Sequence, residues 1–114
     1  MKKVYFTLTG TKHYFGKDCL KPGMKLLLEK EPDNEYDKEV IMVNREGLGR
    51  LGYVASSPYK VLGDSLSAGR LYDRIGKKAY GKVILVTPQG VLCKVNKKSL
   101  VVYQKKEVIE NGSE

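Results

Sequence analysis

Residues 40–54 read VIMVNREGLGRLGYV, and this stretch does most to decide the fold class. The apolar run Val40–Val43 is short and continuous, which is typical of a buried strand. The glycines of segment 47–49 signal a turn, and the chain then returns through Arg50–Val54. The stretch therefore predicts a β-hairpin whose two strands lie in the core.

Alternation of apolar and polar residues with a period of two, which is typical of half-buried strands, marks a further strand. Near the start of the chain, Val4, Phe6 and Leu8 alternate with tyrosine and threonine up to Gly10. The other predicted strands are 24–29, 80–87, 91–95 and 100–103, with turn signals at 22–23 and 88–90. Six or seven short strands predict a small, strongly bent or closed sheet.

One helix is predicted over residues 56–69, and we expect it to cover one opening of the sheet. Its signals are a capping serine, a first-turn proline, apolar residues at helical spacing and a terminating glycine. These residues are Ser56 or Ser57, Pro58, Tyr59, Leu62, Leu66 and Gly69.

The chain has 114 residues, 41% of them hydrophobic, and a formal net charge of +8, which predict one small, self-folding basic domain. No stretch approaches the roughly 18 consecutive apolar residues of a membrane span, so we expect an intracellular, cytoplasmic protein with no membrane partner. Cys19 and Cys93 lie far apart and His13 is the sole histidine. This pattern excludes a disulfide framework and nearly excludes a Cys/His zinc site. We therefore expect no metal and no cofactor.

The charges are distributed unevenly along the chain. Residues 29–46 contain seven acids and three bases, whereas residues 70–106 contain ten bases and one acid. Solubilisation of exposed strand faces would account for any single lysine. Ten bases against one acid favour a polyanion partner, because clustered cations release the counterions condensed on phosphates. A path for a nucleic-acid strand is predicted along Lys77, Lys78, Lys82, Lys97 and Lys98.

Three motifs carry a resemblance to a known family. Residues 27–43 read LLEKEPDNEYDKEVIMV, an acidic, proline-bearing loop with the pattern Asn-x-Tyr-Asp between two apolar strands. Residues 10–14 read GTKHY after the first strand, and residues 51–54 read LGYV before the predicted helix. In this order the motifs resemble those of the HIRAN domain family over residues 4–87.

The resemblance implies a mainly β fold: a small OB-like or SH3-like β-barrel of about six strands with one or two short helices. We expect a single domain over residues 1–106 and a frayed C-terminal tail over 107–114. In helicase-like DNA-repair translocases this domain binds the 3′ end of single-stranded DNA, and the ATPase lies elsewhere. The present sequence contains no GxxxxGKS/T phosphate loop. The prediction is therefore a non-enzymatic module for DNA repair or processing, with single-stranded DNA and a helicase or nuclease as partners.

The acidic loop is the predicted pocket for the strand end. An ionised carboxylate such as Asp37 would accept a hydrogen bond from a terminal 3′-hydroxyl and would repel a phosphate. Asn34 would offer its amide to a base edge, and Tyr36 would stack on a base for ~1–3 kcal/mol.

A second wall of the pocket is predicted from Lys12, His13 and Tyr14. By motif position Lys12 would contact a backbone phosphate, while His13 and Tyr14 would stack on bases. His13 departs from the resemblance, since an aromatic platform is common there in the family. Tyr53 lies beside Gly52 on an apolar strand, so a site role competes with core packing.

Three alternatives stay open. Tyr36 and Asp37 would form a purely structural turn if the carboxylate caps backbone amides and the ring fills the barrel mouth. The module would be a protein-interaction module if an exposed strand edge and the basic surface hold an acidic peptide. A metal-dependent nuclease is the remote alternative. The EF-hand template does not fit, because Lys38 and Asn44 stand where that loop needs glycine and glutamate.

Overall fold

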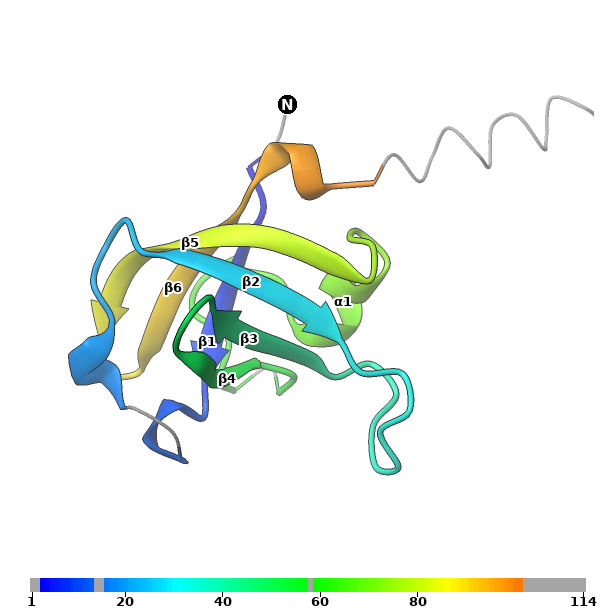
Figure 1. The fold of residues 1–114 in the computed structure, drawn as a ribbon, viewed down its shortest axis with the longest axis horizontal. Helices are drawn as coiled ribbons and strands as arrows, with labels where there is room; N and C mark the ends of the chain where they lie inside the picture. The colour runs from blue at the N-terminus through cyan, green and yellow to red at the C-terminus, as the bar shows by residue number, and fades with distance from the viewer. Residues whose placement is uncertain (1–2, 14–15, 58, 102–114) are drawn as a thin grey trace, which may run out of the picture.

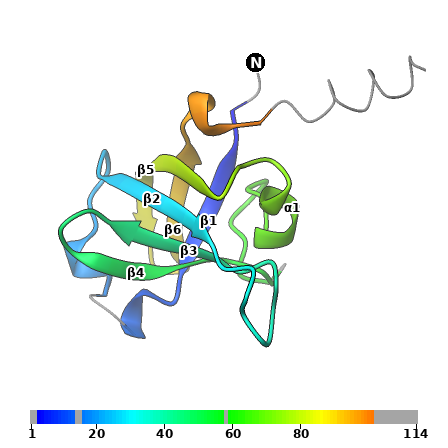
Figure 2. The ribbon, with the colours of Figure 1, turned by 45° about the vertical axis from the view of Figure 1, so that its right-hand side comes forward.

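The centre of the structure is a closed antiparallel β-barrel (Figures 1 and 2). This computed structural model describes residues 3–13, 16–57 and 59–101. Around the barrel the strands follow the order β1-β4-β3-β2-β5-β6, and β6 pairs with β1 to close it. The strands are β1 (Tyr5–Thr9), β2 (Lys25–Lys30), β3 (Ile41–Arg45), β4 (Gly49–Val54), β5 (Lys78–Thr87) and β6 (Gly90–Val95). The mainly β barrel predicted from the sequence is confirmed.

The short helical elements lie in the connections between strands. They are the 3-10 turns η1 (Thr11–His13), η2 (Lys17–Cys19) and η3 (Lys97–Ser99), and the α-helix α1 (Ala68–Tyr72).

The predicted hairpin at residues 40–54 is confirmed as β3 and β4, which pair antiparallel with Met42 opposite Tyr53. Gly47 in the turn between them and Gly49 at the start of β4 have φ angles of 85° and 103°. This left-handed conformation is strained for residues that carry a Cβ. Glycine at these two positions therefore lets the chain leave β3 and return directly as β4.

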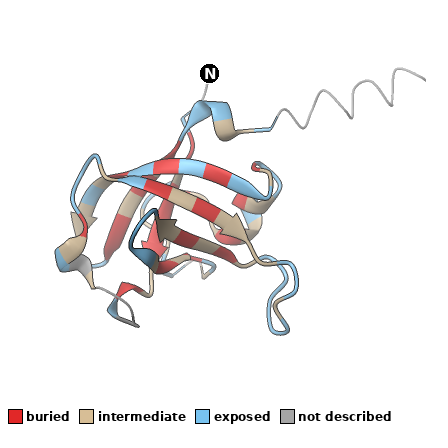
Figure 3. Ribbon diagram, in the orientation of Figure 1, coloured by how far each residue is buried: buried red, intermediate tan, exposed pale blue. Residues whose placement is uncertain are grey.

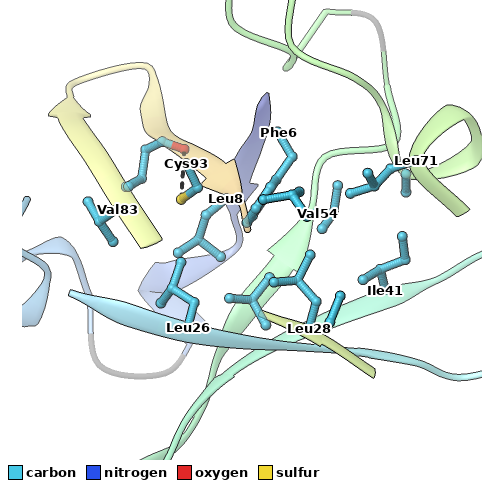
Figure 4. Close-up of a cluster of buried hydrophobic side chains, with 14 of the residues drawn as sticks. Phe6, Leu8, Leu26, Leu28, Ile41, Val54, Leu71, Val83 and Cys93 are labelled. Carbon is cyan, nitrogen blue, oxygen red and sulfur yellow. Dashed lines mark hydrogen bonds between the residues drawn. The ribbon is translucent and has the colours of Figure 1, made fainter. Parts of the chain in front are cut away.

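Alternate residues along the strands point into the barrel, as Figure 3 shows. In the first half of β5, for example, Ala79 and Val83 are buried while Tyr80 and Lys82 are exposed. The inward side chains meet in one apolar core (Figure 4). The period of two in the sequence is thus the period with which a strand exposes its two faces.

The helix α1 lies beside the barrel and contributes the fully buried Leu71 to the core. Lys30 at the end of β2 holds the chain that follows this helix. Its ammonium donates a hydrogen bond to the carbonyl oxygen of Ile75 at 2.8 Å and lies 4.2 Å from the centre of the Tyr72 ring. These contacts fasten α1 to the barrel wall.

The predicted helix over residues 56–69 is wrong. The described residues between 56 and 67 form turns and irregular backbone, and α1 begins near the predicted end; Pro58 lies outside the described residues. Gly63 has a φ angle of 52°, which interrupts a right-handed helix. The hydroxyl of Thr7 in β1 accepts a hydrogen bond from the Leu62 N–H at 2.9 Å and lies 2.8 Å from the Ser65 hydroxyl. Tertiary hydrogen bonds to the barrel therefore replace helical ones in this segment.

The predicted strand over residues 100–103 is described only in its first half. Leu100 forms an isolated bridge with Ile75 rather than a strand of the barrel. Residues 102 and 103, and the predicted tail over 107–114, lie outside the described residues. Within the described ranges, no helix is long and apolar enough to cross a membrane.

The two cysteines differ in environment, which predicts different reactivity. Cys93 in β6 lies in the core, and this burial raises the pKa of its thiol to about 12. Cys19 is partly exposed, and its thiol donates a hydrogen bond to the carbonyl oxygen of Gly16 at 3.3 Å.

Because the thiolate is the reactive form, an alkylating reagent at about pH 8 should label Cys19 in the native protein and Cys93 only after unfolding. Peptide mass spectrometry of native and urea-treated protein measures both sites. Equal labelling of the two thiols in the native protein would contradict the burial of Cys93.

Candidate nucleic-acid interface

The loop between β2 and β3 forms an open hollow together with β4. Figure 1 shows this loop, residues 31–40, projecting from the barrel. The hollow has a volume of about 330 Å³. It is lined by Asn34, Tyr36, Asp37, Val40, Tyr53, Val54, Ser56 and Ala68. Four residues that the sequence predicts for the site, Asn34, Tyr36, Asp37 and Tyr53, therefore meet at one surface, which we call the β4 hollow.

Asn34 organises the loop through its side-chain amide. Its Oδ1 accepts hydrogen bonds from the backbone N–H groups of Tyr36 and Asp37, each at 2.9 Å. Its Nδ2 donates to Oε1 of Glu31 at 3.3 Å. This is an Asx-type turn, in which a side chain replaces a backbone acceptor. The amide predicted to contact a base edge is thus engaged within the loop, where it positions Tyr36 and Asp37.

Tyr36 and Asp37 present their side chains to solvent. The Tyr36 side chain is 95% exposed, so its ring does not fill the mouth of the barrel. Asp37 is also exposed, and its Oδ1 accepts a hydrogen bond from the Glu39 N–H at 2.9 Å. The carboxylate therefore caps a backbone amide, as the structural-turn alternative requires, while the ring remains available to a ligand. Among the described residues, no group of three or more His, Cys, Asp or Glu side chains is arranged to hold a metal ion.

Tyr53 is half-buried in β4 and is held by Arg50, which sequence reasoning did not assign to the site. Nη1 of Arg50 donates to the Tyr53 hydroxyl at 2.9 Å, and the guanidinium carbon lies 5.5 Å from the ring centre. Nε of Arg50 donates to Oδ1 of Asn44 at 3.1 Å, and Nδ2 of Asn44 donates to Oε1 of Glu29 at 2.6 Å. The network crosses three neighbouring strands and orients the Tyr53 ring. A register shift after Val43 places Asn44 opposite Arg50, and no sequence pattern marks it.

A close approach of β1 and β4 brings the end of β1 next to Tyr53. A Cβ on Gly52 would collide with the carbonyl oxygen of Thr9, so glycine is required where the strands meet. Thr9 pairs directly with Tyr53, and the chain turns after it at Gly10, which has a φ angle of 75°.

The second wall predicted from residues 12–14 is described only in part. Lys12 lies exposed in η1, which contacts β4, but it does not line the β4 hollow. His13 is the last residue of η1, and Tyr14 lies outside the described residues. The described start of this wall therefore contacts β4 but is not part of the β4 hollow.

The predicted basic path is divided between two places. Lys82, Lys97 and Lys98 line one groove of about 700 Å³. This lysine groove is formed by the side chains of Lys25, Tyr80, Lys82, Lys94, Lys97 and Lys98, over a floor of smaller and apolar residues. Lys77 and Lys78 do not line it. The ammonium of Lys78 lies 3.9 Å from Oε2 of Glu29, an ion pair on the outer face of the sheet.

A closed six-strand barrel with an exposed aromatic ring and a carboxylate in one hollow defines a small-barrel binding module. The chain belongs to the HIRAN domain family, whose sequence model matches residues 1–97. HIRAN domains are DNA-binding modules rather than catalytic domains. No curated protein matches the chain in sequence.

Two solved structures share the fold. A protein from Lactobacillus plantarum is 24% identical, with 82% of this chain and 93% of that chain covered and a TM-score of 0.55. The HIRAN domain of human HLTF is 16% identical, with 85% of this chain and 78% of that chain covered and a TM-score of 0.54. At these identities the likeness establishes the fold.

Proposed function

We propose that this protein binds single-stranded DNA and recognises its 3′-hydroxyl end in the β4 hollow. The observation that carries the proposal is the pairing of a 95% exposed Tyr36 ring with the exposed Asp37 carboxylate on one open surface. An exposed aromatic ring offers a stacking surface to an unpaired base. A carboxylate beside it suits a terminal hydroxyl, because the hydroxyl donates a hydrogen bond and carries no charge.

Each residue of the hollow has a distinct part in this proposal. Tyr36 stacks on the last base, and Asp37 accepts the hydrogen bond from the 3′-hydroxyl. Asn34 holds both in place through its two hydrogen bonds to their backbone N–H groups. Tyr53, oriented by Arg50, forms the opposite wall. His13 and Tyr14 remain proposed contacts of the second wall, and Lys12 remains a proposed phosphate contact.

The structure favours DNA over an acidic peptide at this surface. The rival function needs a free strand edge, whereas each of the six barrel strands is paired on both sides. Acidic residues crowd the loop around the hollow at Glu31, Asp33, Glu35, Asp37 and Glu39. These carboxylates would repel an acidic peptide. The end of a DNA strand is repelled less than its interior, because the end brings fewer phosphates close to the loop.

A Tyr36→Ala variant tests strand binding at the hollow. We expect it to lose ~1–3 kcal/mol of binding to a single-stranded oligonucleotide, because base stacking is lost. The melting temperature should stay close to that of the wild type, since the ring makes few core contacts. Fluorescence anisotropy and thermal unfolding measure the two effects.

Tyr36→Phe is the matched control and should keep most of the affinity, because it keeps the aromatic face. Two outcomes would contradict a DNA-end site at the hollow. One is that Tyr36→Ala unfolds the protein. The other is that an acidic peptide displaces the oligonucleotide from the wild type but not from Tyr36→Ala. In the cell, such a module would bring a strand end to a helicase or nuclease in DNA repair or processing.

A further inference from the structure

The lysine groove lies on the wall of the barrel opposite the β4 hollow. In the closed strand order, β5 is three strands from β4 in either direction. Figures 1 and 2 show η3, which borders the groove, at the far end of the molecule from the β2–β3 loop. The two surfaces are therefore separate sites on one barrel.

Three lysines form a row across neighbouring strands in this groove. Lys82 in β5 stands directly opposite Lys25 in β2 on one side and Lys94 in β6 on the other. Like charges directly opposite one another destabilise a sheet. Among the described residues, none of the three has an acidic group within 4 Å. Partial burial, and then the charges of Lys3, Lys82 and Lys97, lower the pKa of Lys94. The row of three lysines therefore adds no stability to the folded protein.

An exposed aromatic ring lies in the same groove. Tyr80 alternates with inward residues of β5, so it shares its outward face with Lys82, and it is 60% exposed. Its backbone N–H donates to the Ser99 hydroxyl at 2.9 Å, and its carbonyl oxygen accepts from the Asn96 N–H at 2.7 Å. These bonds hold η3 against β5 and bring Lys97 and Lys98 to the rim of the groove.

We propose that the lysine groove is a second binding site for single-stranded nucleic acid, in which the lysines contact phosphates and a base stacks on Tyr80. The inference rests on the proposed function, since it adds a site for another part of the same ligand class. When the 3′ end of a strand lies in the β4 hollow, that end cannot also lie in the groove on the opposite wall. The groove therefore holds an internal stretch of the strand, or a second strand. A base-stacking ring among the lysines favours nucleic acid over an acidic peptide, which has no π-face to offer.

Circular single-stranded DNA isolates the groove from end recognition, because it has no 3′ end. With circles longer than the ~16 nucleotides that a barrel of this size contacts, Tyr80→Ala should weaken binding about fivefold to a hundredfold. Lys82→Gln should reduce the slope of log affinity against log salt by about 0.7, the loss of one phosphate contact. The matched controls are Tyr80→Phe, which keeps the ring, and Lys60→Gln, an exposed lysine outside the groove.

The melting temperature gives a second readout for Lys82. Lys82→Gln removes two like-charge contacts and should raise the melting temperature by about 2–8 °C while it weakens DNA binding. Lys78→Gln removes the ion pair with Glu29 instead, so it should give no such rise. A fall in the melting temperature of Lys82→Gln would assign this lysine to the scaffold and contradict the proposal.

For a short strand of ~4 nucleotides, the ratio of its affinities with a 3′-hydroxyl and with a 3′-phosphate reports on the β4 hollow, because only the hollow is proposed to read the strand end. The groove variants should leave this ratio unchanged, and failure of the strand to prefer a 3′-hydroxyl would count against the proposed function only. If circular DNA binds Tyr80→Ala and Lys82→Gln as tightly as it binds the wild type, the proposal that the lysine groove binds nucleic acid is wrong. The proposal is also contradicted if an oligoglutamate peptide competes equally well with circular DNA and Tyr80→Ala leaves circular-DNA binding unchanged. The occupant of the groove is then an acidic protein segment.

Discussion

Leu71→Ala should lower the free energy of unfolding by about 2–5 kcal/mol. Leu71 is fully buried in α1 and belongs to the same core as the inward side chains of the barrel. Truncation removes apolar surface from that core and leaves a cavity. The closed barrel has little freedom to collapse into the cavity, because each strand is hydrogen-bonded to two neighbours. Urea or thermal unfolding followed by circular dichroism measures the loss.

Leu62→Ala is the matched control, since it makes the same chemical change at a half-buried position. It should cost much less stability, because Leu62 lies in the irregular segment before α1 and not in the core. DNA binding by both variants should follow the folded fraction. If the two variants lose stability equally, Leu71 of α1 is not packed into the barrel core in solution as it is in this structure.

An oligonucleotide that ends in a 3′-phosphate should bind at least tenfold more weakly than the same strand with a 3′-hydroxyl. The phosphate removes the charge-assisted hydrogen bond to Asp37 and adds repulsion between two anions, together worth ~1.5–3 kcal/mol. Anisotropy with labelled strands that differ only at the 3′ end measures the ratio. Equal affinity for the two strands would contradict the proposal that the protein recognises the 3′-hydroxyl end, but not the proposal that it binds single-stranded DNA.

Asp37→Asn separates the charge of Asp37 from its role in the loop. Asparagine keeps an oxygen that accepts the Glu39 N–H, so the loop should keep its shape. Its amide no longer repels a phosphate and is able to donate to one. We expect the ratio between the two strand ends to fall towards one, with little change in melting temperature. A ratio that stays at the wild-type value would mean that Asp37 does not contact the strand end.

The sequence alone was enough to predict the six barrel strands, from period-two alternation in β1 and from short apolar runs bounded by turn residues elsewhere. Phe6 and Leu8 in β1 alternate with tyrosine and threonine and are buried in the structure. The turn glycines Gly47 and Gly49 also act locally, through φ angles that other residues rarely adopt.

The helix could not be placed in this way. Residues 56–66 combine a cap, a proline and helical spacing, yet Thr7 and Ser65 bind the segment to β1 and Gly63 breaks it. These hydrogen bonds join residues more than 50 positions apart in the chain, so no local pattern contains them. Tertiary context therefore overrode local propensity here.

For the candidate interface, the sequence by itself determined which loop carries an aromatic ring beside a carboxylate and that the second half of the chain is basic. Only the tertiary structure decided that Tyr53 joins Tyr36 and Asp37 at one hollow and that Arg50 orients it. It also divided the basic residues, placing Lys82 and Lys97 in a groove on the opposite wall and Lys78 outside it. The physical reason is barrel closure. Strand order and register decide which outward side chains become neighbours, and both depend on pairings between distant segments of the chain.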